Sequence, residues 1–432
     1  MIATLLFASF IVLMLLGVPI GVALGLAGAA AIGLANPQTQ WFGLLAVPQN
    51  FYAGLGKYPL LAVPMFVLVG SIFDRSGVAS RLVAFATALV GRGPGMLPLI
   101  AIAVAMFMGG ISGSGPATAA AVGGVMIAAM NRAGYPGAYS ASVVGAAAAT
   151  DILIPPSIAF IVYSVLVPGA SVPALFAAGL VPGVLVGIAL IAPSVWMARR
   201  HGMGQLEAAL PRPPLLKSFV ESIWGLLAPV LILGGMRMGW FTPTEAAVVA
   251  VFYGVFVGMV IHRTMGWRDL VEALRESGEL SAVILVVVAL AGIFAYSLST
   301  LGVIDPITQG IVGSGLGEQG VLALVMLLLV VAGMFLDGIS IFLIFVPLLW
   351  PLMQHYHWDP VWFGVLLTLM VAMGQFTPPM AVNLMVSCRI AGVSMEHTVR
   401  WVLPLVLAMG VVVLAVIIWP QLALWLPRAL GF

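Results

Sequence analysis

The chain alternates long apolar stretches with short polar ones, and one apolar stretch is too long to be a single membrane-crossing helix. Residues 93–131 contain no Asp, Glu, Lys or Arg, whereas a helix needs only about 20 apolar residues to cross a bilayer. Gly, Ser and Pro interrupt this stretch at its centre, in GGISGSGPATAAA (109–121), and Arg92 and Arg132 flank it. The pattern predicts two short helical arms joined by an irregular tip.

The two halves of the chain share a pattern of Gly and Pro positions. The Pro-Pro pair that begins at Pro155 recurs at Pro378, 223 residues later, and Gly110 recurs as Gly333 at the same offset. A polar stretch, RRHGMGQLEAALPRPPLLK (199–217), separates the halves. Because several Gly and Pro residues share one offset, the sequence predicts an internal repeat.

We predict a first repeat at 1–198, a cytoplasmic loop and linking span at 199–242, and a second repeat at 243–432. Each repeat holds two spans, a broken stretch, a span interrupted by Pro-Pro and a closing span. The predicted spans ahead of the broken stretches are 4–34 and 58–74, then 243–262 and 279–301. The predicted hairpins are 94–131 and 319–354, the broken helices are 137–168 and 360–389, and the closing spans are 173–198 and 400–427. The predicted amphipathic surface helices are 75–92 and 263–278.

Lys and Arg in short loops indicate the cytoplasmic side of a membrane. Arginines flank the first broken stretch, and the central loop carries Arg199, Arg200, Arg212 and Lys217. The second broken stretch has Glu318, His355, His357 and Asp359 at its ends, without Lys or Arg. Each stretch therefore enters and leaves on one side, as a re-entrant hairpin, and the two hairpins enter from opposite sides. The prediction is an inverted repeat with a cytoplasmic N-terminus and a periplasmic C-terminus.

Composition supports this membrane architecture. Of the 432 residues, 62% are hydrophobic and 7% are charged, whereas a soluble domain has about 25% charged residues. Alternating segments of about ten residues, which a transmembrane barrel would need, do not occur. The net charge of +2 gives no indication of nucleic-acid binding, and the single cysteine, Cys388, excludes an internal disulfide. The predicted fold class is an all-α polytopic membrane protein.

Irregular backbone at membrane depth is tolerated only where it lines a cavity or is buried in protein. The chain has four such places: the tips at 112–115 and 335–338, and the breaks at 150–157 and 375–383. Pro in a first helical turn and Thr377 as an N-cap would begin the second half-helices. Their positive ends suit an anion, and the free carbonyls of the preceding half-helices suit Na⁺. No Lys or Arg is predicted at midplane depth.

Two acidic residues are candidates for the site. Asp151 is the only charged residue between Arg132 and Arg199, and an acid at membrane depth indicates function. We hypothesise that it adds a cation ligand or takes up a proton; alternatively, it caps the following half-helix. Asp337 lies in the second tip and could be only an N-cap in a polar turn.

Structural alternatives exist for the remaining motifs. The first tip could be ordinary small-residue helix packing, the Pro-Pro pairs could only kink a span, and Asn383 could make an interhelical hydrogen bond. His355 and His357 are an incomplete set for a metal site, so a solvated loop is the simpler interpretation.

These motifs together resemble the large membrane subunit of tripartite ATP-independent periplasmic (TRAP) transporters, the DctM-like family. The resembling stretches are GGISGSGPATAAAVGGVMIAAMNRAGYP (109–136), IPPSIAFIVYS (154–164), GMFLDGISIFLIFVPLLWP (333–351) and TPPMAVNLMVSCRIAGVS (377–394). The resemblance implies Na⁺-coupled uptake of organic acids such as dicarboxylates or sialic acid by an elevator mechanism. It also implies two partners, a small four-helix membrane subunit (DctQ-like) and a periplasmic substrate-binding protein (DctP-like).

The resemblance also implies two sodium sites with a substrate region beside them. One sodium site would use the first tip and the backbone before the first Pro-Pro pair: Ser112, Gly113, Ser114, Ala147 and Pro155, joined by Asp151 on our hypothesis. The other would use the second tip and break: Gly333, Asp337, Thr377 and Pro379. The implied substrate region is Ser112, Ser114, Ser157, Asp337 and Asn383. The chain departs from the family where alanines precede Asp151 and where Ala381 replaces a usual glycine.

Three other functions would require different features. A stand-alone divalent-anion/sodium symporter would share the hairpins and the repeat but need no binding protein. An intramembrane enzyme would need a catalytic set at one depth, yet all five His lie in predicted loops or at span ends. A passive channel would show downhill flux without sodium dependence. The predicted class is therefore a transporter and not an enzyme.

Overall fold

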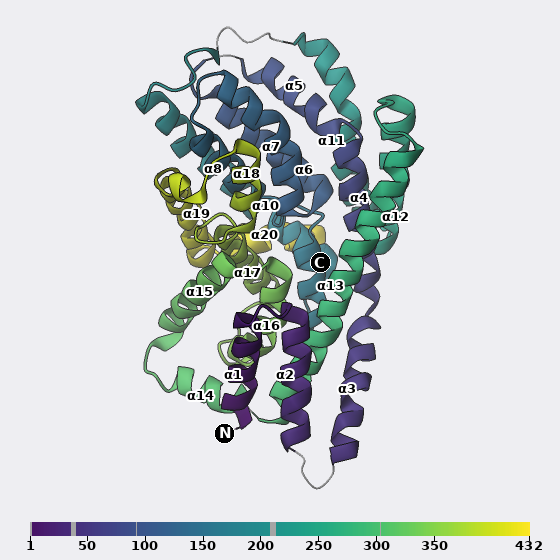
Figure 1. Cartoon of the computed structure of the whole chain (residues 1–432), viewed down its shortest axis with the longest axis vertical. Helices are drawn as coiled ribbons and strands as arrows, with labels where there is room; N and C mark the ends of the chain where they lie inside the picture. Colours follow the sequence, from purple (N-terminus) through teal and green to yellow (C-terminus); the bar gives the residue numbers. More distant parts are fainter. Residues whose placement is uncertain (1, 36–39, 92, 208–212, 303) are drawn as a thin grey trace.

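The computed structural model describes residues 2–35, 40–91, 93–207, 213–302 and 304–432 (Figure 1). Over these ranges the chain is helical and contains no β-strand, and eight of its helices are long and apolar enough to cross a membrane. The all-α membrane class is thus confirmed. Arg92 and Arg212, which the orientation argument uses, lie outside the described residues.

The first broken stretch is a helical hairpin, as predicted. Its arms are α6 (Met96–Ser112) and α7 (Gly115–Arg132), which pack against each other. Gly113 ends α6 in the left-handed conformation, with φ of 63°, which glycine adopts without steric cost. Ser114 is extended, and Pro116 then lies in the first turn of α7, where its missing N–H costs no helical hydrogen bond.

The second broken stretch is also a hairpin. Its arms are α15 (Gly317–Phe335) and α16 (Gly338–His355), and Leu336 leaves α15 in an extended conformation. The Asp337 side chain caps α16 by accepting hydrogen bonds from backbone N–H groups of its first turn. Both tips therefore use local chemistry that the sequence supplies.

Both Pro-Pro spans are broken, as predicted. The first consists of α8 (Gly137–Ala148) and α9 (Ile158–Leu166), and the second of α17 (Pro360–Gly374) and α18 (Val382–Ala391). The bond between the two prolines is cis in each break. The alternative that Pro-Pro only kinks a continuous helix is wrong.

The second half-helices do not begin at the prolines. Ser157 caps α9 by accepting from the Phe160 N–H (3.3 Å), and Ala381 holds the equivalent position before α18 with φ of 39°. Thr377 caps no helix; its hydroxyl donates to the Met373 carbonyl (2.6 Å). The predictions of proline in the first turn and of a Thr377 cap are wrong, because the residues after each pair first form an extended or left-handed link.

The hairpins and broken helices exchange partners between the repeats. Helix α18 of the second repeat packs on α7 and α8 of the first, and α9 of the first repeat packs on α16 of the second. The same relation thus occurs twice, once in each direction. Such a reciprocal exchange is expected for two structurally related repeats.

The N-terminal span of the prediction is two helices. α1 (Ile2–Leu15) and α2 (Ile20–Ala35) pack against each other across a turn that contains Gly17, whose φ is 82°. A single span at 4–34 is therefore wrong. The turn residues Gly17, Val18 and Pro19 hardly change the hydropathy, so the hydropathy pattern does not indicate that a helix ends there.

The next segment also has more helices than predicted. α3 (Gln40–Leu55) precedes a short 3-10 helix, η1 (Tyr58–Leu61), and α4 (Ala62–Arg75). The second predicted span therefore combines η1 and α4. The predicted surface helix at 75–92 corresponds to α5 (Val78–Val90).

The predicted surface helix at 263–278 is not separate. α13 (Trp267–Thr300) runs unbroken for 34 residues, a length of about 51 Å at 1.5 Å per residue. Its charged N-terminal part contains Arg, Glu and Leu, which favour helix, so the change in polarity does not end the helix. The short α14 (Ile304–Val312) follows it.

The remaining helices complete the two repeats. They are α10 (Val172–Arg200), α11 (Leu215–Arg237), α12 (Pro243–Phe256), the π-helical η3 (Val257–Ile261), the 3-10 helix η4 (Met395–Thr398), α19 (Val399–Ile418) and α20 (Gln421–Leu430). The closing span of the second repeat divides into α19 and α20 before Pro420, where a continuous span was predicted. Figure 1 shows α3, α4, α12 and α13 along one side of the molecule.

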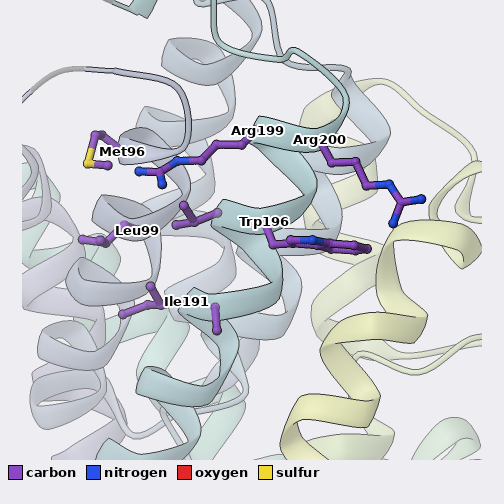
Figure 2. A pocket seen from close by; sticks show the side chains of 8 residues that line it. Met96, Leu99, Ile191, Trp196, Arg199 and Arg200 are labelled. Atoms are coloured by element: carbon purple, nitrogen blue, oxygen red, sulfur yellow. The ribbon is translucent and has the colours of Figure 1, made fainter.

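An open groove of about 750 Å³ lies between α6 and α10, at the end of α10 (Figure 2). Apolar residues such as Met96 and Leu99 form one part of its wall, and Trp196, Arg199 and Arg200 form the other. The Arg200 guanidinium lies 4.9 Å from the Trp196 ring centroid. Arg and Trp beside an apolar helix surface are typical of a membrane–water boundary. The groove contains none of the predicted site residues.

The start of the central loop is fastened to the base of the first hairpin. Glu207, 3% exposed, accepts hydrogen bonds from the Leu97 N–H (2.6 Å) and the Tyr135 hydroxyl (2.7 Å). The Tyr135 oxygen in turn accepts from the Gly95 N–H (2.7 Å). The carboxylate therefore satisfies unpaired N–H groups at the start of α6, where negative charge is favoured.

We predict that Gly374→Ala destabilises the fold. A Cβ at this position would lie 2.5 Å from backbone atoms of Gly333, so two backbones must separate, at a cost of about 1–3 kcal/mol. Thermal unfolding of the purified protein measures the effect. Gly410→Ala is the matched control, because nothing lies within 4 Å of a Cβ there. Equal melting temperatures for the two variants would contradict the prediction.

We predict a pH dependence of stability from Glu207. Burial raises the pKa of Glu207 above its ordinary value of 4.5, so the folded protein holds this proton more tightly than the unfolded chain. Stability should therefore fall as pH rises from below 4.5 through the raised pKa. Glu207→Gln removes this titration and should flatten the melting temperature between about pH 4 and about pH 7. The exposed Glu279→Gln should leave the slope as it is; an unchanged slope in Glu207→Gln would refute the assignment.

Candidate functional site

The two hairpin tips meet at a cavity of about 450 Å³. The first tip contributes Ser112 to Ala117, and the second contributes Asp337 to Ile339. Gln375, from the second break, and Ile152 and Ile158, from the first, complete this side. Residues of α4 and α13 form the opposite wall. All four irregular places of the sequence analysis thus border one space or pack directly beneath it.

Asp151 lies fully buried beneath the first tip. Its Oδ2 accepts a hydrogen bond from the Ser112 hydroxyl (3.0 Å), which also lies 3.2 Å from the Thr118 hydroxyl. The backbone of Gly113 and Ser114 lies against the same carboxylate. Its Oδ1 is buried without a hydrogen-bond partner among the described residues. The alternative that Asp151 caps α9 is wrong, because Ser157 holds that position.

The first tip rests on the first Pro-Pro break. A Cβ at Gly113 would lie 2.6 Å from the Pro156 carbonyl oxygen, and one at Gly110 would lie 3.6 Å from the Pro155 carbonyl oxygen. Gly113 therefore lets the tip approach the Pro156 carbonyl, whereas the 3.6 Å distance at Gly110 is an ordinary contact. The Ala147 carbonyl accepts from the Thr150 hydroxyl (2.7 Å). The structure thus brings Ser112, Gly113, Ser114, Asp151 and Pro155 together, with Ala147 one turn deeper in α8.

The Ser157 hydroxyl is committed to the break itself. It donates to the Ile152 carbonyl (2.6 Å) and accepts from the Phe160 N–H. Ser157 is fully buried. Its single O–H is thus used within the break, so donation to an anionic substrate would have to replace the bond to Ile152.

The second tip and the second break are joined in the same way. The Ala381 N–H donates to the Met334 carbonyl (3.1 Å), and Gly333 lies against Gly374. Asp337 accepts from the Ile339 N–H (3.1 Å) and the Ser340 N–H (3.2 Å), so its alternative role as an N-cap is confirmed. Asp337 also borders the cavity, whereas Thr377 and Pro379 lie on the far part of the break and do not.

Asn383 connects the two repeats at the site. It is fully buried, and its side-chain N–H donates to the Gln375 amide oxygen (3.3 Å) at the end of α17. A Cβ at Gly115 would lie 2.7 Å from the Asn383 amide, so this side chain packs directly against the first tip. Its Oδ1 has no hydrogen-bond partner among the described residues. The hydrogen bond links α18 to the end of α17, and the unpartnered Oδ1 lies against the first hairpin at Gly115.

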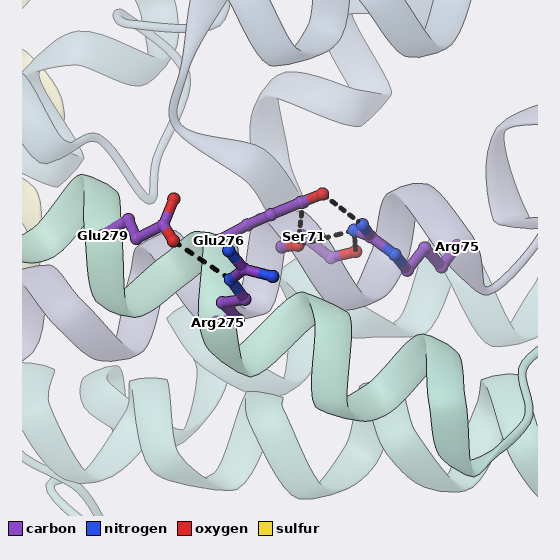
Figure 3. A network of polar contacts seen from close by, with 5 residues as sticks. All are labelled: Ser71, Arg75, Arg275, Glu276 and Glu279. Carbon is purple, nitrogen blue, oxygen red and sulfur yellow. Dashed lines mark hydrogen bonds and ion pairs between the residues drawn. The ribbon is translucent and has the colours of Figure 1, made fainter.

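The opposite wall carries charges that the sequence analysis missed. Asp74 and Arg75 lie at the end of α4, and Glu276 lies on α13. Figure 3 shows Arg75 and Glu276. Arg75 pairs with Glu276 at 2.7 Å and donates to the Ser71 hydroxyl at 2.8 Å. The residues that line the cavity thus include an Arg, in addition to the hydroxyls of the first tip. The pattern assigned these residues to polar surface stretches, and nothing in it indicates a contact between residues 201 positions apart.

Paired hairpins and broken helices around one cavity define a membrane transport protein. Two solved transporters share the fold: YdaH of Alcanivorax borkumensis, with TM-score 0.61, 14% identity and coverage of 93% of this chain and 98% of that one, and MtrF of Neisseria gonorrhoeae, with TM-score 0.59, 14% identity and coverage of 90% and 85%. At this identity the likeness concerns the fold alone.

The family model for the tripartite ATP-independent periplasmic transporter, DctM component, matches residues 7–422, and the chain belongs to this family. It is 37% identical over 411 residues to the C4-dicarboxylate TRAP transporter large permease protein DctM of Pseudomonas aeruginosa, covering 94% of both chains. It is 33% identical to the sialic acid large permease SiaM of Vibrio cholerae, covering 96% of both.

A longer relative is the isethionate permease protein DctMQ of Oleidesulfovibrio alaskensis, 36% identical over 414 residues. The match covers 95% of this chain and 64% of that protein. These relatives are permease subunits and not enzymes, so the chain is a multi-pass transport subunit of the bacterial TRAP class.

Proposed function

We propose that this chain is the permease subunit of a sodium-coupled, binding-protein-dependent secondary transporter that imports organic acids. The named substrates of the relatives are C4-dicarboxylates, sialic acid and isethionate. These compounds share a small organic skeleton with an anionic group. The cavity between the hairpin tips has the size and the polar tips that such a ligand needs.

Asp151 carries the proposal of sodium coupling. A buried carboxylate oxygen without a partner is costly, and a bound cation would satisfy it. Asp151 Oδ1 is such an oxygen, and the Ser112 hydroxyl and the first tip surround the same carboxylate. Oxygen donors from carboxylate, hydroxyl and backbone groups fit a hard cation such as Na⁺. Ser112, Gly113, Ser114, Asp151 and Pro155 would hold this ion.

We place a second sodium ion at the second tip and break. Gly333, Asp337, Thr377 and Pro379 would supply its oxygen ligands, with the Asn383 amide oxygen toward the substrate. The Thr377 hydroxyl, which donates to Met373, and the Asp337 carboxylate, which caps α16, both keep lone pairs for a cation. The second hairpin and break also correspond in sequence to the first, since Pro378 lies 223 residues after Pro155.

Transport would proceed by an elevator movement. The hairpins and broken helices pack on one another, whereas α2, α3, α4 and α13 pack together as a second group. The cavity lies between these two groups. Sliding one group along the other would carry the cavity from one membrane face to the opposite face without opening a continuous pore.

The family supports the proposed assembly. A small four-helix membrane subunit would pair with this chain, and a periplasmic binding protein would deliver the organic acid. The N-terminus would lie in the cytoplasm and the C-terminus in the periplasm, in the bacterial inner membrane. A stand-alone symporter is not favoured, because the whole chain matches a component of a tripartite system.

Replacing Asp151 by Asn tests the proposed sodium site. The change keeps the side-chain volume and removes the charge, so half-saturating Na⁺ for uptake should rise about tenfold or more. Uptake of labelled organic acid into proteoliposomes that hold the complete transporter measures it. Asp305→Asn, at an exposed position of α14, is the control. Unchanged sodium and pH dependence in Asp151→Asn would remove Asp151 from the mechanism.

Replacing the two tip serines tests how the first tip contributes. Ser112→Ala removes the hydroxyl that contacts Asp151, so it should weaken sodium affinity more than Ser114→Ala. The double variant should weaken it further. The same sodium titration of uptake measures all three. Wild-type sodium affinity in the double variant would count against the first site.

A further inference from the structure

The wall opposite the hairpin tips has an unusual distribution of charge. Among the described residues that line the cavity, Arg75 is the one Lys or Arg, and it is accompanied by Asp74, Glu276 and Asp337. An organic anion that enters this space therefore meets three carboxylates and a single fixed cation. The position of that cation decides where the anionic group of a ligand can lie.

The Arg75–Glu276 pair is close but not enclosed. The Arg75 Nη2 lies 2.7 Å from Glu276 Oε1, and the two side chains are 24% and 46% exposed. Ion pairs with this much contact with water contribute little net stability, because water screens the attraction and solvates both charges. Arg75 can therefore exchange the Glu276 carboxylate for another anionic group at a small cost.

The rest of the Arg75 environment keeps its side chain in the cavity wall. Its Nη1 donates to the Ser71 hydroxyl (2.8 Å) and to the Ser71 carbonyl (3.3 Å), both one turn earlier on α4. Glu276 comes from α13, and its other oxygen lies 3.5 Å from the Ser71 hydroxyl. Loss of the contact with Glu276 would thus leave Arg75 oriented by its own helix.

We propose that Arg75 binds the anionic group of the transported organic acid, and that Glu276 is the internal competitor for this place. The inference rests on the proposed transport function and adds a substrate-binding residue on the α4 and α13 wall. The planar guanidinium offers paired N–H donors that match a carboxylate or a sulfonate. Glu276 accepts from Nη2 of this guanidinium and gives up that contact when the ligand arrives.

A purely structural role makes a different prediction. If the pair only fastened α4 to α13, removal of either partner would weaken the same contact and change transport in the same direction. If Glu276 competes with the ligand, substitutions of the two residues shift the half-saturating ligand concentration in opposite directions. Arg75→Gln removes the anion-binding group, whereas Glu276→Gln removes the competitor and leaves Arg75 free.

The experiment is equilibrium exchange of labelled succinate in proteoliposomes that hold the complete transporter, with isethionate as the probe if wild type does not exchange succinate. Arg75→Gln should raise the half-saturating concentration about tenfold. Glu276→Gln should lower it about threefold. Arg75→Lys should fall between wild type and Arg75→Gln, because the charge remains but the planar fork is lost.

Figure 3 shows the matched control. Arg275 and Glu279 form a second pair on α13, 3.1 Å apart and 71% and 68% exposed, outside the cavity lining. Arg275→Gln and Glu279→Gln should change the half-saturating concentration less than twofold. They match the test substitutions in chemistry and differ from them in position.

Shifts of the same sign in Arg75→Gln and Glu276→Gln, or changes in maximal rate alone, would overturn the proposal. If Arg75→Gln does not fold, as thermal unfolding would show, the sign of the Glu276→Gln shift still decides. Failure of the wider function looks different: wild type itself would then show no sodium-dependent accumulation of any organic acid offered. Sodium-driven uptake in wild type with the wrong signs in the variants would refute the Arg75 assignment alone.

Discussion

A bilayer gives no water to backbone groups that are left unpaired where a helix stops, and this chain stops helices at four places within its apolar stretches. Each place must find partners inside the protein. Asp337 accepts from N–H groups at the start of α16, Ser157 does the same for α9, and the Ala381 N–H donates to Met334 of the adjacent hairpin. Two of these partners are local caps, whereas the Ala381 contact joins a break to the neighbouring hairpin. The Ser112 hydroxyl likewise joins the first tip to Asp151 of the first break. The cavity is the space around which the four interruptions gather.

The same constraint explains why glycine is concentrated there. The first tip approaches the Pro156 carbonyl of the first break at Gly113, and the second hairpin approaches α17 where Gly333 meets Gly374. A side chain at these positions would separate backbones whose contact brings carbonyls and hydroxyls toward the cavity. Asp151 and Asn383 then place polar groups beneath a surface that is otherwise built from backbone. The α4 and α13 wall, by contrast, presents the charged side chains of Asp74, Arg75 and Glu276 to the cavity.

Much of this arrangement could be predicted from the sequence, because hairpins and breaks leave local marks. The Ser-Gly-Ser-Gly tip, the Pro-Pro pairs and their common offset indicate where helices stop, and the loop arginines indicate that the halves are inverted. Other features leave no such mark. The turn at Gly17 lies within an apolar stretch, and α13 continues through a change of polarity that suggested an end.

The candidate site also contains contacts that the sequence does not predict. The hydroxyl of Ser112 and the carboxylate of Asp151 could each be recognised as unusual, but not their contact. The start of α18 could not be placed, because the left-handed link at Ala381 depends on its packing against the second hairpin. Arg75 and Glu276 meet only through the packing of α4 on α13. The sequence pattern is analysed one stretch at a time, so it places Arg75 and Glu276 in separate polar surface segments.

The exchange of partners between the repeats also bears on how the protein is made. The surface of α7 and α8 that α18 covers stays without its partner until almost the whole chain has been synthesised. The first half must therefore wait in the membrane, with polar tip and break exposed to lipid or to the insertion machinery. Each half alone lacks the partner surfaces that the other half supplies. The contact of α18 with α7 and α8 can form only after the second break has been made, so the first hairpin receives this cover last.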